Sequence, residues 1–159
     1  MGLFNFKKNN IIYAPFKGKC LPLKEVDDGV FSMEMLGKGV AFRFDDEFVN
    51  SPCFGEVIMV AHTKHAVGIR MKNGAEILVH VGLDTVELNG RGLKVFVNEG
   101  DIVRPGDQLI MVNREYMKEI NVDMTTMLVI TNSDKYEFSF ENYGEMKNKK
   151  ELFEITKKE

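Results

Sequence analysis

The chain has 159 residues, of which 44% are hydrophobic and 28% charged, which is typical of a single globular domain and argues against a disordered chain. Its net charge of −3, with Lys and Arg scattered apart from the run at 147–150, argues against a nucleic-acid partner. No stretch approaches the roughly 18 apolar residues of a membrane span. The few apolar residues at the start are too short a run for the hydrophobic region of a signal peptide, so we expect a cytoplasmic protein that is not inserted in a membrane.

Short runs rich in Val, Ile and Phe recur along the chain and predict strands, because turn signals such as KNG, NEGD and RPGD separate them. The runs cover residues 10–15, 39–44, 55–60, 66–71, 75–81, 93–97, 107–112, 125–131, 136–140 and 151–155. One short helix is expected at 113–121. Regularly spaced short strands predict an all-β sandwich or barrel.

A weak internal repeat accompanies these strands. APFKGKCLPL at 14–23 resembles SPCFGEVIMV at 51–60, each with Pro followed three residues later by Gly. A second echo links 97–112 with 140–155, although the later copy lacks the Gly-Asp turn. Both echoes indicate two similar β units packed together.

The two cysteines, Cys20 and Cys53, form no CxxC pair and predict no disulfide framework. We interpret each as a small buried hydrophobic residue.

The segment around Asn73-Gly74 predicts a β-hairpin, since this dipeptide is flanked by AVGIRM and AEILVHV. With these two residues as the loop, Val67 pairs with His80 and His65 pairs with Gly82.

This register predicts that His65 and His80 share one face as diagonal neighbours, with backbones about 7–8 Å apart. Gly82 would leave room for the ring across from it, and Thr63 would share the face if the strand extends that far. Asp84, four residues beyond His80, would reach the rim.

Two facing neutral histidines support two chemistries. One ring nitrogen can attack an electrophile such as phosphorus while the other ring stabilises the developing charge, or both rings can ligate a metal such as zinc. His62 has the opposite face parity from His65 and is expected at the surface.

These residues resemble the glucose-type EIIA family of the bacterial phosphoenolpyruvate-dependent sugar phosphotransferase system. The most specific stretches are TKHAVGI (63–69) and EILVHVGLDTVEL (76–88), and the resemblance runs from about residue 11 to 131. It implies one domain over 1–159, with 1–9 flexible. The implied fold is an antiparallel β-sandwich of two sheets with an internally duplicated hairpin or barrel-like motif and only short helical turns.

In this family the histidine of the H-x-G-x-D segment, here His80, accepts a phosphoryl group from phospho-HPr and passes it to a cysteine of an EIIB sugar permease domain. The resemblance implies that His65 supports the transfer, that Thr63 orients His65, and that Asp84 and Asp28 meet an arginine of HPr. No cofactor is required, and the protein would meet the membrane only through an EIIBC permease.

The resemblance also implies a hydrophobic ring around the histidines through which partners dock. Its expected members are Val30, Phe31, Met35, Leu36, Leu78 and Val86.

Other functions fit parts of the sequence. HVGLD at 80–84 matches an H-x-x-x-D ligand pair of lysostaphin-type zinc hydrolases, although the H-x-H pair of that family is missing. Lys72 near a hairpin tip resembles the modified lysine of a lipoyl or biotinyl carrier, although Met71-Lys72-Asn73 breaks the usual pattern. A mainly regulatory EIIA-like binding protein is a further alternative, and zinc at His65 and His80 is an incidental or regulatory alternative.

Overall fold

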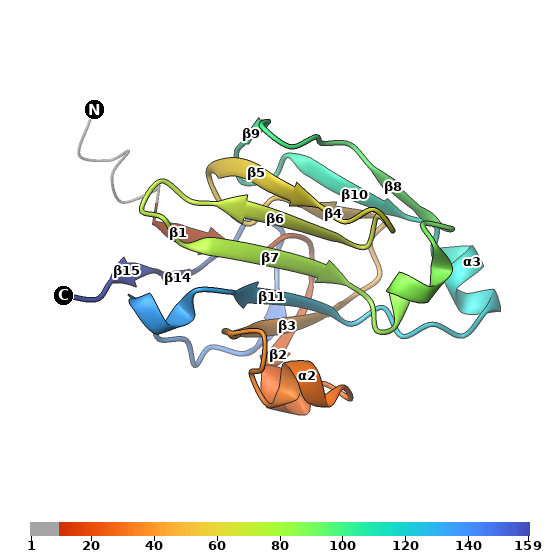
Figure 1. The fold of residues 1–159 in the computed structure, drawn as a ribbon. Helices are drawn as coiled ribbons and strands as arrows, with labels where there is room; N and C mark the ends of the chain where they lie inside the picture. The colour runs from red at the N-terminus through yellow and green to blue at the C-terminus, as the bar shows by residue number, and fades with distance from the viewer. Residues whose placement is uncertain (1–9) are drawn as a thin grey trace.

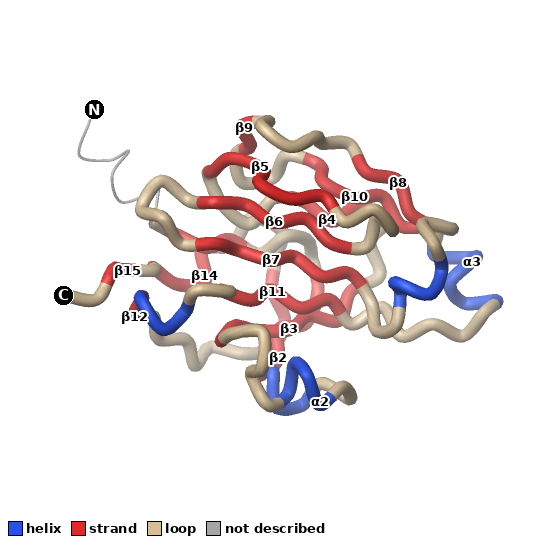
Figure 2. The backbone as a smooth tube through the Cα atoms, viewed as in Figure 1, coloured by secondary structure: helices blue, strands red, loops and turns tan. Residues whose placement is uncertain are grey.

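A computed structural model describes residues 10–159, so the flexibility expected for residues 1–9 lies outside the described residues. Strands dominate these residues, and all of their pairings are antiparallel (Figures 1 and 2). The strands are β1 (Ile11–Tyr13), β2 (Gly18–Pro22), β3 (Lys38–Phe44), β4 (Phe48–Asn50), β5 (Gly55–Val60), β6 (Ala66–Arg70), β7 (Glu76–Val81), β8 (Leu93–Val95), β9 (Ile102–Val103), β10 (Gln108–Val112), β11 (Thr126–Ile130), β12 (Tyr136–Glu137), β13 (Gly144–Met146), β14 (Glu151–Glu154) and β15 (Thr156–Lys157).

The helical elements are short and lie at the edges of the strand layers. They are α2 (Gly29–Ser32), α3 (Arg114–Glu119) and the 3-10 turns η1 (Leu23–Glu25), η2 (Thr85–Leu88) and η3 (Ser133–Lys135). The helix expected at 113–121 is therefore confirmed as α3, whereas α2 was not predicted. Within residues 10–159 no helix is long and apolar enough to cross a membrane.

The largest sheet has eight strands in the order β13-β2-β3-β11-β7-β6-β5-β9. A three-stranded sheet, β4-β10-β8, lies behind its upper part in Figure 1, and the pairs β1-β14 and β12-β15 complete the layers. This architecture confirms the predicted antiparallel β-sandwich.

The main core lies between the layers. It contains inward-facing residues of the large sheet, such as Val67, Ile77 and Val79, together with Leu109 and Ile110 of β10. A second cluster lies on the outer face of the large sheet, where Leu23, Val26 and Phe31 pack on strand residues such as Met127 and Val129. This second cluster fixes the segment carrying η1 and α2 against the sheet.

The internal repeat corresponds to two structural units that pair with each other. The Tyr13 backbone N–H donates to the Pro52 carbonyl over 2.7 Å, and the Asn50 N–H donates to the Pro15 carbonyl over 2.9 Å. Since Pro15 and Pro52 occupy the same place in the repeat, these two bonds are equivalent. The strands that follow, β2 and β5, each form a hairpin, with β3 and β6 respectively.

The second echo extends the same relationship. β13 pairs with β2 as β9 pairs with β5, and β14 pairs with β1 as β10 pairs with β4. The Lys149 N–H donates to the Ala14 carbonyl as the Gly106 N–H donates to the Ser51 carbonyl. The later copy lacks the glycine, yet Lys149 keeps the left-handed backbone of Gly106, with φ of 66° against 93°.

The hairpin between β6 and β7 differs from the sequence prediction by one residue. Met71 and Ala75 close the loop, because the Met71 N–H donates to the Ala75 carbonyl over 2.8 Å. Lys72, Asn73 and Gly74 therefore form a three-residue loop, and Gly74 has the positive φ of 91° that such loops place at their third residue. The observed register pairs Ala66 with His80 and Val67 with Val79, so the predicted pairing of Val67 with His80 was wrong.

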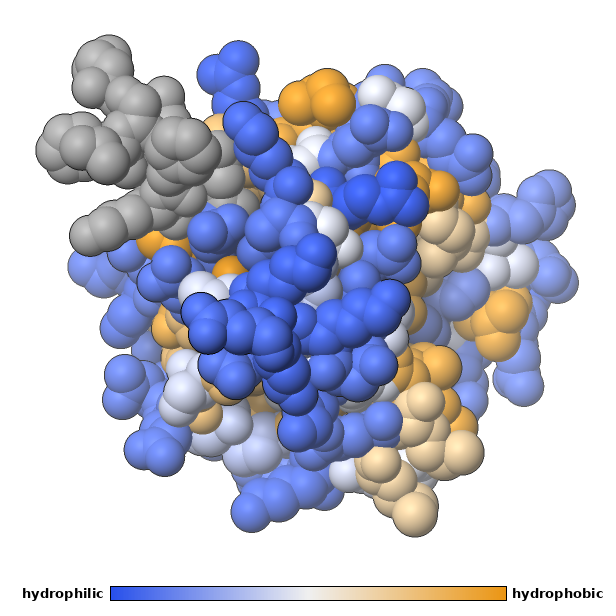
Figure 3. All heavy atoms as spheres, turned by 60° about the vertical axis from the view of Figure 1, so that its left-hand side comes forward, coloured by the Kyte–Doolittle hydropathy of each residue, from blue (hydrophilic) through white to orange (hydrophobic). Residues whose placement is uncertain are grey.

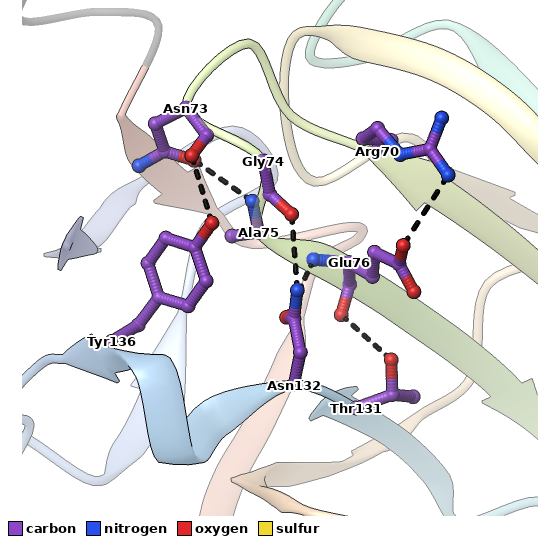
Figure 4. Close-up of polar contacts among 8 residues, drawn as sticks. All are labelled: Arg70, Asn73, Gly74, Ala75, Glu76, Thr131, Asn132 and Tyr136. Atoms are coloured by element: carbon purple, nitrogen blue, oxygen red, sulfur yellow. Dashed lines mark hydrogen bonds and ion pairs between the residues drawn. The ribbon is translucent and has the colours of Figure 1, made fainter.

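Side chains from distant segments hold this loop in place (Figure 4). The Tyr136 hydroxyl donates to the Asn73 carbonyl over 2.8 Å, and the Asn132 side-chain amide donates to the Gly74 carbonyl over 3.0 Å. The Glu76 N–H in turn donates to the Asn132 side-chain oxygen. These bonds fix the start of β7 and hence the register of His80 further along the strand.

Two glycine-to-alanine variants, at Gly55 and at Gly29, test how closely β5 approaches β6 in the second repeat unit. A Cβ at Gly55 would lie 2.4 Å from the Arg70 carbonyl oxygen, whereas a Cβ at Gly29 meets nothing within 4 Å. We expect Gly55→Ala to lower the free energy of unfolding by about 1–3 kcal/mol and Gly29→Ala to change it by less than about 0.5 kcal/mol. Urea unfolding measures both, and equal effects would contradict the packing argument.

Candidate functional site

The alternation of side chains along β7 places His80 on the outer face of the large sheet. Ile77, Val79 and Val81 are buried in the main core, whereas Leu78 and His80 point to the opposite face. Ala66 of β6 and Met127 of β11 are the residues directly beside His80 in the sheet. Both residues are apolar, so the imidazole has hydrophobic neighbours on both adjacent strands.

His65 lies in the bend before β6 rather than in the strand. The bend is closed by bonds from the Ala61 N–H to the Ala66 carbonyl and from the Lys64 N–H to the Ala61 carbonyl, and Lys64 has a φ of 64°. The Thr63 hydroxyl is 2.6 Å from His65 Nδ1. His65 is 9% exposed, so its ring is held between this hydroxyl and the sheet.

The structure brings the two imidazoles together. Their ring centroids are 4.8 Å apart, with the planes at 75°. The predicted reason for this proximity was wrong, because in the observed register the residue across from His65 is Val81, whose N–H donates to the His65 carbonyl over 2.7 Å. The bend at Lys64 allows the His65 side chain to reach His80 although the two residues are not diagonal neighbours on one strand face.

Gly82 serves a different purpose from the predicted one. It has a φ of 79°, and a Cβ there would lie 2.4 Å from Cγ2 of Thr85. The Thr85 hydroxyl donates to the Val81 carbonyl over 2.5 Å, which closes the turn directly after β7. Gly82 therefore makes room for this turn, not for His65, and the turn carries Asp84 to the edge of the site.

The short helix α2 brings Phe31 and Asp28 to His80. Asp28 caps the helix by accepting a hydrogen bond from the Val30 N–H over 3.0 Å. The Phe31 ring lies edge-on to His80 with centroids 4.8 Å apart, and Phe31 is only 5% exposed. Phe31 therefore packs against the imidazole and presents almost no surface to a partner.

A shallow depression of about 210 Å³ opens over His80. Asp28 and Asp84 both line it, and apolar side chains form much of its wall. The lining residues are Asp28, Val30, Phe31, Leu36, His80, Asp84, Thr85 and Val86.

The residues expected to form a hydrophobic ring divide into two groups. Val30, Met35, Leu36 and Val86 are between 40% and 69% exposed, so they provide apolar surface beside the depression. Phe31 and Leu78 instead pack in or against the outer cluster. Met33, at 75% exposure, lies next to this group and was not predicted, because the short helix α2 that precedes it was not foreseen from the sequence.

Burial controls the charge of both rings. It lowers the pKa of His80 to about 4, and a charge on His65 acts in the same direction, against the opposing effects of the Gly82 and His80 carbonyls and of Asp28. Burial also lowers the pKa of His65, opposed by the backbone of Thr63. Both imidazoles are therefore neutral at pH 7 and each keeps one nitrogen lone pair.

Neutral imidazoles are also metal ligands, but the donor set around this pair is small. Within residues 10–159 there is no group of three or more His, Cys, Asp or Glu side chains arranged to hold a metal ion. Zinc at this site would thus have His65 and His80 as its ligands from the described chain, fewer than the three or four that zinc sites in proteins use.

Comparison with known proteins finds relatives in one family. The sequence model for the family described as "phosphoenolpyruvate-dependent sugar phosphotransferase system, EIIA 1" matches residues 10–136. The glucose-specific EIIA component of Bacillus cereus is 43% identical over 136 residues, which is 86% of this chain and 82% of that protein.

A second relative is a larger protein. The chain is 42% identical over 147 residues to the beta-glucoside-specific EIIBCA component of Bacillus subtilis, covering 92% of this chain but only 24% of that component. Among solved structures, glucose permease IIA from Mycoplasma capricolum matches with a TM-score of 0.83 and 34% identity, over 91% of this chain and 94% of that one.

The lowered pKa of His80 predicts a pH dependence of stability. The unfolded chain takes up a proton on His80 near pH 6.5, whereas the folded protein takes it up only near pH 4. The free energy of unfolding is therefore unaffected by this group above about pH 6.5 and decreases as the pH falls from 6.5 toward 4. We expect a loss on the order of 2 kcal/mol from His80, after discounting for its partial exposure. Urea unfolding of wild type and His80→Asn between pH 7 and 4.5 tests this, since the variant should lose correspondingly less stability.

Proposed function

The chain belongs to the glucose-type EIIA family of the phosphoenolpyruvate-dependent sugar phosphotransferase system, and from this premise we propose that it is a cytoplasmic phosphocarrier whose acceptor is His80. In this proposal His80 takes a phosphoryl group from phosphohistidine on HPr and passes it to a cysteine of an EIIB domain. The observation that carries the proposal is the pair of neutral imidazoles with ring centroids 4.8 Å apart, of which His80 lines an open depression with an apolar rim.

The reacting atom in this proposal is Nε2 of His80. Nδ1 is buried and has no hydrogen-bond partner within residues 10–159, and the backbone of Gly82 and of His80 raises the pKa of the ring. We assign the proton of the neutral ring to Nδ1, because that nitrogen is enclosed by the protein. That tautomer leaves the lone pair on Nε2 free to attack. As the Nε2–P bond forms, the N–P bond to the donor histidine breaks, and HPr keeps the electron pair of that bond.

His65 would stabilise the transferring group. The Thr63 hydroxyl lies at Nδ1 of His65, and if it donates there, the proton of the neutral ring must sit on Nε2. That N–H can then donate to the equatorial oxygens of the phosphoryl group, where negative charge is distributed. In this proposal the two rings have different roles, because the Thr63 hydroxyl lies at Nδ1 of His65 whereas Nδ1 of His80 has no hydrogen-bond partner in the described part of the chain.

The surroundings of the depression suit a transient docking event. Asp28 and Asp84 offer carboxylates to a cationic side chain of HPr, and the exposed apolar residues at the rim offer surface that becomes buried on contact. The same rim would meet EIIB, so donor and acceptor dock alternately. Since this chain transfers phosphate only between proteins in this scheme, the sugar is a property of the permease partner.

Phosphate labelling tests the acceptor assignment. We expect incubation with phosphoenolpyruvate, Enzyme I and HPr to place an acid-labile phosphate on His80, and His80→Gln to abolish it. His65→Gln should still be labelled but should transfer to EIIB at least about 100-fold more slowly, since a donor to the transition state is lost. His62→Gln is the matched control, because His62 is exposed and outside the site.

Two outcomes would contradict the proposal. Labelling of His80→Gln at the wild-type level would exclude His80 as the acceptor. A stable, acid-resistant modification of Lys72 in place of phosphohistidine would support the carrier alternative.

The tautomer argument gives a further prediction at Thr63. Thr63→Val removes the hydroxyl from His65 Nδ1 with little change of volume, whereas Thr63→Ser keeps it. We expect Thr63→Val to slow phosphoryl transfer by about tenfold to 100-fold and Thr63→Ser to remain near wild type. Rapid-quench kinetics with phospho-HPr measure both rates, and a fast Thr63→Val variant would remove Thr63 from the mechanism.

A further inference from the structure

Two methionines are unusually open to solvent beside the candidate site. Met33 is 75% exposed and Met35 is 69% exposed. They flank Glu34, whose φ of 57° turns the chain directly after α2, and the Met35 N–H donates to the Val30 carbonyl over 3.0 Å. This bond ties the exposed pair to the wall of the depression over His80.

The remaining sulfur-containing side chains of residues 10–159 are much less accessible. Met59 and Met111 are partly buried. The buried methionines are Met71, Met117, Met124, Met127 and Met146.

Both cysteines are protected as well. Cys20 and Cys53 are at most 1% exposed. Burial raises the pKa of Cys20 to about 12 and raises that of Cys53 as well, so neither is a thiolate at neutral pH. Because peroxides react with accessible thiolates and thioethers, Met33 and Met35 are the preferred targets among residues 10–159.

The surface around these methionines is apolar. Val30, Leu36 and Val86 are each at least 40% exposed and lie around the depression. Figure 3 shows hydrophobic side chains gathered at the lower right of the drawn face, at the height of α2 in Figure 1, beside a largely hydrophilic area. A thioether contributes apolar contact to such a surface, whereas a sulfoxide places a strongly polar oxygen in it.

We propose that Met33 and Met35 form a peroxide-sensitive modification site that controls docking at His80. The thioether sulfur attacks one oxygen of hydrogen peroxide, and the S–O bond forms as the O–O bond breaks. The oxygen bound to sulfur gives up its proton to the leaving hydroxide, which departs as water. The sulfur is oxidised by two electrons and hydrogen peroxide is reduced. The resulting sulfoxides lower the affinity of the surface for HPr and leave the imidazole pair unchanged.

The regulatory part of this inference rests on the proposed function, whereas the chemical part does not. Sulfoxide formation depends only on the exposure of the sulfur atoms, and it can be reversed by methionine sulfoxide reductases. Oxidation would therefore reduce phosphoryl transfer without damaging the fold, and reduction would restore it.

The first experiment maps the oxidation sites. The whole chain is treated with dilute hydrogen peroxide, the reaction is stopped with catalase, and peptides are identified by mass spectrometry. We expect Met33 and Met35 to gain one oxygen before any methionine buried in the structure. Equal or faster oxidation of Met71, which is 2% exposed, would overturn the site.

The second experiment measures docking with untreated HPr. We expect the oxidised protein to have a KM for phospho-HPr about fivefold to tenfold higher, with little change in kcat, because apolar contact is lost while the chemistry is intact. Treatment with methionine sulfoxide reductase should restore the KM. The double variant Met33→Leu, Met35→Leu keeps apolar side chains but has no thioether at these positions, so peroxide should leave its own KM for phospho-HPr unchanged, whatever the value before treatment.

Titration calorimetry with unphosphorylated HPr separates this inference from the proposed function. If untreated protein binds HPr and accepts phosphate but oxidation changes neither, the regulatory inference is wrong and the phosphocarrier function stands. If untreated protein neither binds HPr nor accepts phosphate, the proposed function and the docking role of the methionines both fail. A double variant as sensitive to peroxide as wild type would also overturn the assignment.

Discussion

The pairing of β7 between β6 and β11 is the constraint on which the site depends. Alternation along this strand commits Ile77, Val79 and Val81 to the core, and it thereby commits His80 to the opposite face. A slip of one residue would bury the imidazole among the core residues and expose the valines. The bonds of Asn132 and Tyr136 to the loop before β7 therefore help to set the position of His80 further along the strand.

The same placement explains the electrostatics. The outer face of the sheet is covered by η1 and α2, so His80 is enclosed on one side by Phe31 and open on the other. Partial enclosure lowers the pKa of the ring without closing the approach to it, and His65 lowers it further. Packing a four-residue helix on one sheet face therefore leaves the His80 imidazole neutral, in contact with Phe31 and still accessible from the depression.

The sequence predicted the strands, the histidine pair and the duplication well, because each rests on local patterns. It failed on the hairpin register, since Asn73-Gly74 fits both a two-residue loop and the end of a three-residue loop. The predicted proximity of His65 to His80 was still correct, because His65 lies in a bend outside the strand and its ring reaches His80 in the observed register. The helix α2 was missed because four residues show no periodicity, and without it the burial of Phe31 could not be foreseen.

The reciprocal pairing of the two repeat units has a consequence for synthesis of the protein. The strands that complete the first unit, β13 and β14, come from residues 144–154, whereas their partners β2 and β1 lie near the beginning of the chain. A growing polypeptide would therefore expose the edges of β1 and β2 until residues 144–154 have left the ribosome. Such edges favour association between nascent chains. In the second unit, β4 and β5 pair with β10 and β9, which follow sooner in the sequence. Protection by a chaperone during translation therefore matters more for the first unit than for the second.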